Sequence, residues 1–372
     1  MPLSKEQLMY SEIRKKYAAI FALVMLACIA VTTSHLYLNE LSPWAMSVLT
    51  VTTGFLLASE NGQEFSEGKT SLKNCVFFSA GMLRKIVPLY FVCMILALAP
   101  YIFFSFKGVY TFDSEMITAI ILQALMLHAW SPKYVFQVNG VCWFFPVCLL
   151  LFLLFPAVNT SVKKLKTRRA LLLLAAAAVI LQSAVSILVK YLLPSVNTKW
   201  FNIAFPPCRI FDFTLGCIAA QWVFCFPDSR RSRFGSTAVE LCAVTFTLLS
   251  IYAYYYTFRY EFLSWSGYAM IYSLPSMFLV ICLARSEGYI SKIIGNSVFA
   301  YLGFFGASVY LVHRVVSDLL LTAMTALKIS ENIQQIAVPV LAVLVSFAAA
   351  IVWNLLFGNS NRRSAKAESS LS

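Results

Sequence analysis

The sequence predicts an all-α integral membrane protein with about ten transmembrane helices and one re-entrant or interfacial helix. Of its 372 residues, 60% are hydrophobic and only 12% are charged, whereas soluble domains carry about 25% charged residues. The apolar residues also form runs of about 20, the length needed to cross a hydrocarbon core roughly 30 Å thick. A large soluble protein is excluded because its apolar residues would not gather in such runs.

Eleven apolar runs are candidate helices. They cover residues 17–38, 43–59, 86–106, 115–130, 141–158, 170–189, 203–225, 238–257, 267–284, 298–317 and 333–357. The run at 115–130 is the shortest, begins beside Asp113 and Glu115, and ends close to Pro132. We therefore assign it to a re-entrant or interfacial helix on the outer side, which leaves ten spans.

Basic residues predict the orientation of these spans. Most of the 29 Lys and Arg lie in short clusters near residues 5–16, 69–85, 163–169, 230–233, 285–292 and 362–366. With ten spans every cluster falls on one side, which the positive-inside rule makes cytoplasmic. We expect a cytoplasmic segment at 1–16, a membrane-embedded domain at 17–357 and a cytoplasmic tail at 358–372. The net charge of +13 thus encodes topology, and nucleic acid is not an expected partner.

Tryptophan residues gather on the opposite side. Five of the seven, Trp44, Trp130, Trp143, Trp200 and Trp265, fall near the predicted outer surface. An interfacial aromatic belt explains part of this asymmetry, but belts occur at both faces. Aromatic rings also stack on the apolar faces of sugars, and in that interpretation Trp143 is a candidate contact for substrate.

Two histidines are candidates for proton transfer. His35 closes the first run near the outer boundary, and His313 lies in the outer third of its run. An imidazole titrates near neutrality and suits general-base work on a hydroxyl. The alternative for each is a structural histidine that is satisfied by hydrogen bonds.

A charged pair opens the seventh run at its outer end. Arg209 and Asp212 are three residues apart, so they share a helix face and can form an ion pair. Two interpretations stay open: the pair orients a substrate, or it clamps neighbouring helices together.

Arg84 and Lys85 lead the 86–106 run at its cytoplasmic mouth. Their charge is explained by topology, and the same charge suits the phosphates of a nucleotide-bearing donor. The chain has three His and no phosphate-binding, dinucleotide-binding or zinc-binding motif. We therefore expect neither a metal nor a bound cofactor.

Several segments, in order, resemble the acyltransferase 3 family of bacterial membrane-bound O-acyltransferases. They are residues 25–31 leading to His35, 53–56, 84–90 (RKIVPLY), 143–146 (WFFP), 153–156 (LLFP), 207–213 (PCRIFDF) followed by Gly216, and 308–313 (SVYLVH). By position, His35 is similar to the essential first-helix His of the family, and His313 to the His of its late Tyr-Leu-x-His motif. The family commonly carries Arg eleven residues before the first His, where this chain has Val24.

The resemblance implies an enzyme of the bacterial inner membrane. It would move an acyl group, usually acetyl, from cytoplasmic acetyl-CoA or another acyl-CoA to a hydroxyl of a cell-surface polysaccharide or of its lipid-linked glycan precursor. Membrane lipid is the other expected partner. Two alternatives stay open: a transporter or flippase for a lipid-linked sugar, and a catalytically inactive or sensory relative, which Val24 allows.

Overall fold

The computed structural model describes residues 12–34, 41–61, 71–84, 86–108, 111–227, 232–257 and 271–357. Within these ranges all regular structure is helical. The helices of the first half are α2 (Ala18–Ser34), α3 (Leu41–Glu60), α4 (Leu72–Arg84), α5 (Val87–Ala97), α6 (Ala99–Phe106), α7 (Ser114–Ala124), the 3-10 helix η1 (His128–Trp130), α8 (Phe144–Lys163) and α9 (Arg168–Leu192). Those of the second half are α10 (Thr198–Ile203), η2 (Pro206–Arg209), α11 (Ile210–Cys225), α12 (Arg233–Thr257), α15 (Ser273–Arg285), α16 (Tyr289–Ile294), α17 (Ser297–Phe304), α18 (Gly306–Ala326) and α19 (Glu331–Phe357).

The predicted fold class is confirmed. In the described part of the chain, eight helical segments are long and apolar enough to cross a membrane. The helices α2 and α15 are apolar but shorter, and both coincide with predicted runs. The number of crossings therefore stays a prediction. The tail at 358–372 and residues 1–11 of the predicted N-terminal segment lie outside the described residues.

Two predicted runs are interrupted. The run at 86–106 breaks at Leu98, where Pro100 at the start of α6 has no N–H to continue the helical hydrogen bonds. The run at 298–317 breaks at Phe305, and α18 then continues to Ala326, well beyond the predicted end. The helix α4 has no counterpart among the predicted runs, because only one of its faces is apolar.

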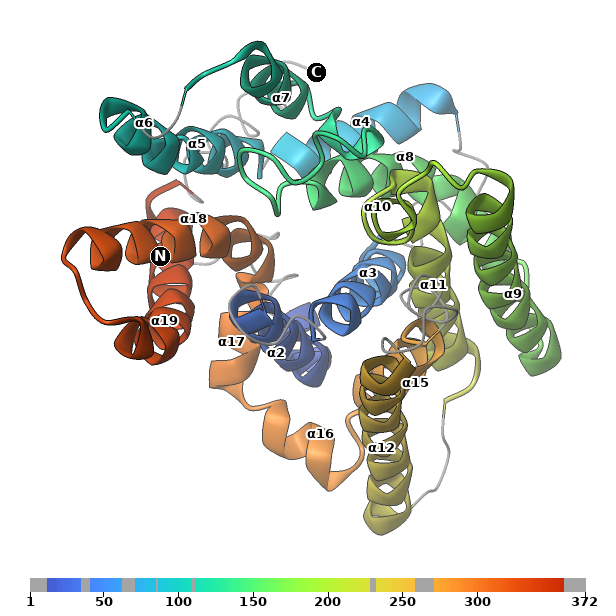
Figure 1. Ribbon diagram of the computed structural model, residues 1–372. Coiled ribbons are helices and arrows are strands. Elements are labelled where there is room, and N and C mark those ends of the chain that lie inside the picture. Colours follow the sequence, from blue (N-terminus) through green and yellow to red (C-terminus); the bar gives the residue numbers. More distant parts are fainter. Residues whose placement is uncertain are drawn as a thin grey trace, which may run out of the picture.

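The helices α2 and α3 lie at the centre of the bundle. In Figure 1, α18 and α19 flank this pair on one side, α9 lies on the other, and α12 and the α5–α7 group close the remaining sides. Glycines let the central backbones approach closely. A Cβ on Gly216 of α11 would lie 2.1 Å from the Val51 carbonyl oxygen of α3, and one on Gly303 of α17 would lie 1.7 Å from the Phe21 carbonyl oxygen of α2. Small residues at such contacts are typical of membrane helix packing.

The segment predicted to be re-entrant or interfacial forms α7 and η1, which are too short to span a bilayer. The hydroxyl of Tyr90 in α5 donates to the carbonyl of Gln123 at the end of α7 (2.6 Å), and the indole N–H of Trp200 donates to the carbonyl of Ala129 (2.9 Å). Trp200 and Trp143 are both buried, so these two rings face the protein interior, unlike members of a lipid-facing belt.

Candidate functional site

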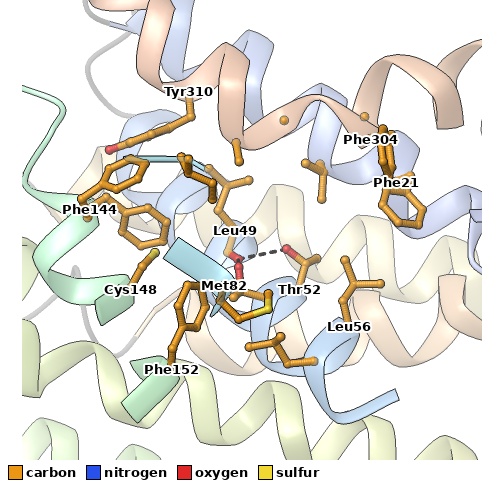
Figure 2. Close-up of a pocket in the computed structure, with 18 of the residues that line it drawn as sticks. Phe21, Leu49, Thr52, Leu56, Met82, Phe144, Cys148, Phe152, Phe304 and Tyr310 are labelled. Atoms are coloured by element: carbon orange, nitrogen blue, oxygen red, sulfur yellow. Dashed lines mark hydrogen bonds between the residues drawn. The ribbon is translucent and has the colours of Figure 1, made fainter. Parts of the chain in front are cut away.

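An apolar cavity of about 260 Å³ lies between α2, α3, α4, α8, α17 and α18. Its wall follows α3 from Leu49 to Glu60, which is about 16 Å of helix. In Figure 2, Tyr310 and Phe144 lie together on one side of the cavity, and Phe21 and Phe304 on the other. The cavity is thus elongated along the central helix of the bundle.

The cavity wall offers few polar groups. The hydroxyl of Thr52 donates to the carbonyls of Val48 (2.7 Å) and Leu49 (3.0 Å), and that of Thr53 donates to Leu49 (2.7 Å). Each hydroxyl oxygen still has lone pairs that can accept a hydrogen bond from a ligand. Such a lining suits a slender, largely apolar ligand with one or two amide groups.

Aromatic rings close the end of the cavity opposite Glu60. Phe144 and Tyr310 meet edge to face, with ring centroids 5.4 Å apart. Trp143 packs edge to face on Phe144 at 5.7 Å, and the ring centroid of His313 lies 5.6 Å from that of Tyr310. The structure therefore brings two candidates from the sequence, Trp143 and His313, together behind the aromatic wall.

His313 is buried and held in a defined orientation. Its Nδ1 lies 2.7 Å from the Tyr310 carbonyl oxygen, so the ring donates from Nδ1, because a carbonyl can only accept. A neutral ring in this tautomer has its lone pair on Nε2. The hydroxyl of Ser317 donates to the His313 carbonyl, and the hydroxyl of Tyr310 donates to the Val141 carbonyl at 3.1 Å. The geometry suits a ring that accepts a proton at Nε2.

The predicted ion pair between Arg209 and Asp212 forms, with 2.9 Å between Nη1 and Oδ2 and both side chains buried. Arg209 also donates to the Asn202 carbonyl (2.6 Å), and the Ser273 hydroxyl donates to Asp212 Oδ1 (2.5 Å). Gln182 of α9 joins the network through Ser273 (3.3 Å). Five helical segments, α9, α10, η2, α11 and α15, thus meet at this pair. The network favours the helix clamp over direct contact with substrate.

The remaining candidates are distributed differently. His35 and Lys85 lie outside the described residues. Arg84 is exposed at the end of α4, and its neighbours Leu83 and Ile86 line the apolar cavity. Val24, at the position where the family commonly has Arg, also lines this cavity, and a Cβ on Gly306 would lie 2.3 Å from Val24 Cγ1.

A second, polar hollow lies at the Glu60 end of the bundle and was not predicted from the sequence. One part has a volume of about 640 Å³ and an adjoining part about 340 Å³, and both include Lys163 and Gln221 in their walls. We call the two parts together the basic cleft. From the sequence, its lysines indicated only which side of the membrane is cytoplasmic. The order of residues in the chain does not show which cations face a common cavity.

Comparison with known proteins agrees with this architecture. A sequence profile of the acyltransferase 3 family, described as an acyltransferase domain, matches residues 16–358. No curated protein and no solved structure gives a significant match. Because the matched region covers nearly all of the membrane-embedded chain and includes both cavities, the chain belongs to the acyltransferase 3 family of membrane acyltransferases.

Proposed function

We propose that the protein transfers an acyl group, acetyl being the simplest case, from acyl-CoA on the cytoplasmic side to a hydroxyl of a surface polysaccharide or its lipid-linked precursor. The observation that carries the proposal is the apolar cavity, which leads from Glu60 to an aromatic wall directly in front of His313. A slender donor arm in this cavity would place its thioester near that wall. We propose the bacterial inner membrane as the location, with both termini cytoplasmic.

The reaction needs a base at the closed end of the cavity. The acceptor hydroxyl loses its proton to a histidine as its oxygen attacks the thioester carbonyl carbon. The C–S bond breaks, an ester C–O bond forms, and the thiolate leaving group takes up a proton. We propose His35 as the base or acyl relay and His313 as the group that assists proton movement.

The other candidates have supporting roles in this proposal. Trp143 borders the acceptor side of the aromatic wall, where its ring can contact a sugar. Arg209 and Asp212 hold together the helical segments that frame this side. Arg84 and Lys85 attract the donor beside the cavity mouth. Val24 makes the cavity wall apolar where the family commonly has a cation, so donor binding in this chain depends on cations elsewhere.

The test is transfer of label from radioactive acyl-CoA to candidate glycans by the purified protein in nanodiscs. We expect an ester-linked product that mild base releases, with strong loss of product in His35→Ala and His313→Ala. The exposed Lys328→Gln is the matched control and should keep full activity. Label transfer that survives both histidine substitutions would contradict these roles. Glycan binding without label transfer, over a broad set of donors, would favour a carrier or an inactive relative.

A further inference from the structure

The basic cleft has a charge pattern that topology alone does not require. Five cationic side chains line it, and they come from segments far apart in the chain: Lys16, Lys163, Lys164, Lys166 and Arg285. Glu60 and Glu287 are the two acidic residues in the wall. Positive-inside charges need only lie on the correct side of the membrane. Here they converge on a shared hollow, so its local potential is positive.

The cations are presented by a fixed framework. The amide of Gln221 on α11 donates to the carbonyls of Lys163 (3.4 Å) and Leu165 (3.1 Å), which fixes the turn after α8. Arg285, at the end of α15, donates to the Phe226 carbonyl at 2.9 Å. The ends of α8, α11 and α15 are therefore tied together around the cleft, and the turn that carries the lysines is held by hydrogen bonds within the protein.

The basic cleft and the apolar cavity meet at one residue. Glu60 lines both of them. An elongated ligand can therefore place an anionic head among the lysines while its thinner arm follows α3 toward Tyr310. A coenzyme A thioester has this division, with three phosphate groups on the nucleotide and a slender arm that ends in the thioester.

We propose that the basic cleft binds the phosphate groups of the acyl donor, with Lys163, Lys164 and Lys166 as the principal contacts. The inference rests on the proposed function and extends it, since it assigns donor binding to residues other than Arg84 and Lys85. Lysines act on phosphate as point charges, and three of them within four positions can serve separate phosphate groups. An anionic lipid headgroup has the same phosphate chemistry, so the test distinguishes the two sources.

The experiment measures binding of coenzyme A without an acyl group to the purified full-length protein, so that no turnover is needed. Isothermal calorimetry compares coenzyme A with its 3′-dephospho form in nanodiscs of zwitterionic lipid and in nanodiscs with added phosphatidylglycerol. The test variant is Lys163→Gln/Lys166→Gln. The control is Lys73→Gln/Lys292→Gln, which removes two exposed lysines that belong to the predicted cytoplasmic clusters and do not line the cleft.

We expect the test variant to lose affinity for coenzyme A by about tenfold or more, because it removes two cations that can each donate a charge-assisted hydrogen bond to phosphate. A tenfold loss corresponds to about 1.4 kcal/mol. The control should bind as the wild type does, in both lipids. Equal affinity of the test variant and wild type would overturn the proposal while leaving acyl transfer intact. If added phosphatidylglycerol weakens coenzyme A binding by the wild type, while the test variant and the wild type bind coenzyme A equally in zwitterionic lipid, the cleft belongs to lipid headgroups. If the wild type binds no coenzyme A, both this inference and the proposed donor are wrong. If the wild type binds coenzyme A but transfers no acyl group, only the proposed function is wrong.

Discussion

In the proposed mechanism, His313 assists proton movement at the closed end of the cavity. Its Nδ1 donates to the Tyr310 carbonyl, which fixes the tautomer that accepts a proton at Nε2. Removing a positioned proton-transfer group typically lowers a rate by about 10²–10⁴. We expect His313→Ala to lower kcat within that range and to leave coenzyme A affinity unchanged, since the basic cleft lies at the other end of the cavity. Single-turnover kinetics with calorimetry would show this separation, and an equal fall in binding would refute it.

His128 predicts a pH dependence of stability. Burial lowers the pKa of this histidine to about 4, and the nearby backbone of Cys142 opposes the shift in part. Between about pH 6.5 and pH 4 the unfolded chain binds a proton that the folded protein does not. Stability therefore falls as the pH drops through this window, by about 2 kcal/mol at pH 5.

The measurement is the thermal midpoint in detergent at pH 7.5 and pH 5, for wild type and His128→Gln. The other two histidines are present in both proteins, so the difference between the two pH slopes isolates His128. We expect a shallower slope for the variant. Identical slopes would show that this ring does not titrate in the window.

The ion pair between Arg209 and Asp212 can be tested as a helix clamp. Asp212→Asn leaves a buried guanidinium without its counter-charge, and breaking such a pair typically costs about 3–5 kcal/mol. The double change Arg209→Met/Asp212→Leu removes both charges and should recover most of the lost stability. We expect the double variant to melt close to wild type and to retain acyl transfer. A stable but inactive double variant would instead place the pair in substrate orientation.

At the scale of elements, the close contact between α3 and α11 depends on two glycines. A Cβ on Gly54 would lie 2.3 Å from the Phe213 carbonyl oxygen, and one on Gly216 would lie 2.1 Å from that of Val51. Backbone atoms cannot move aside as a side-chain end can. We expect Gly216→Ala to destabilise the protein by about 1–3 kcal/mol through overpacking.

The matched control is Gly81→Ala in α4, where an added Cβ has no atom within 4 Å. Loss of glycine flexibility at such a site typically stabilises by about 0.4–1 kcal/mol. Thermal melts in one detergent compare the two variants. A Gly216→Ala protein as stable as Gly81→Ala would mean that the helices separate more easily than the structure indicates.

Helices were predictable from the sequence where their residues are continuously apolar. Length and hydropathy identified the positions of most described apolar helices, including α9 and α19, which are largely exposed toward lipid. The break at Phe305 was not predictable, because it depends on the fit of α17 against α2 at Gly303 and not on a proline. The helix α4 was missed because its polar face interrupts the apolar pattern.

For the whole molecule, the important feature is that the apolar cavity and the basic cleft meet at Glu60, at the end of α3. The sequence supplied His313 and Trp143 as candidates, and the fold places both behind one aromatic wall. The sequence could not supply the basic cleft, because Lys16, Lys163 and Arg285 come together only when α8, α15 and the segment before α2 pack. The sequence also gave no reason to prefer a helix clamp over substrate orientation for Arg209 and Asp212. The deciding partners, Gln182 and Ser273, lie on other helices.

In the proposed mechanism, the donor enters at the basic end and the acyl group leaves at the opposite end. The test is transfer of label across the membrane of proteoliposomes. Radioactive acyl-CoA is supplied outside and the acceptor glycan is sealed inside. Protease access to the termini determines the orientation of the protein. We predict that the enclosed glycan is labelled only by protein molecules whose basic end faces the acyl-CoA. No label should appear when acyl-CoA and glycan are both on the side opposite the basic end. Efficient transfer with donor and acceptor both confined to the end opposite the lysines would contradict this mechanism.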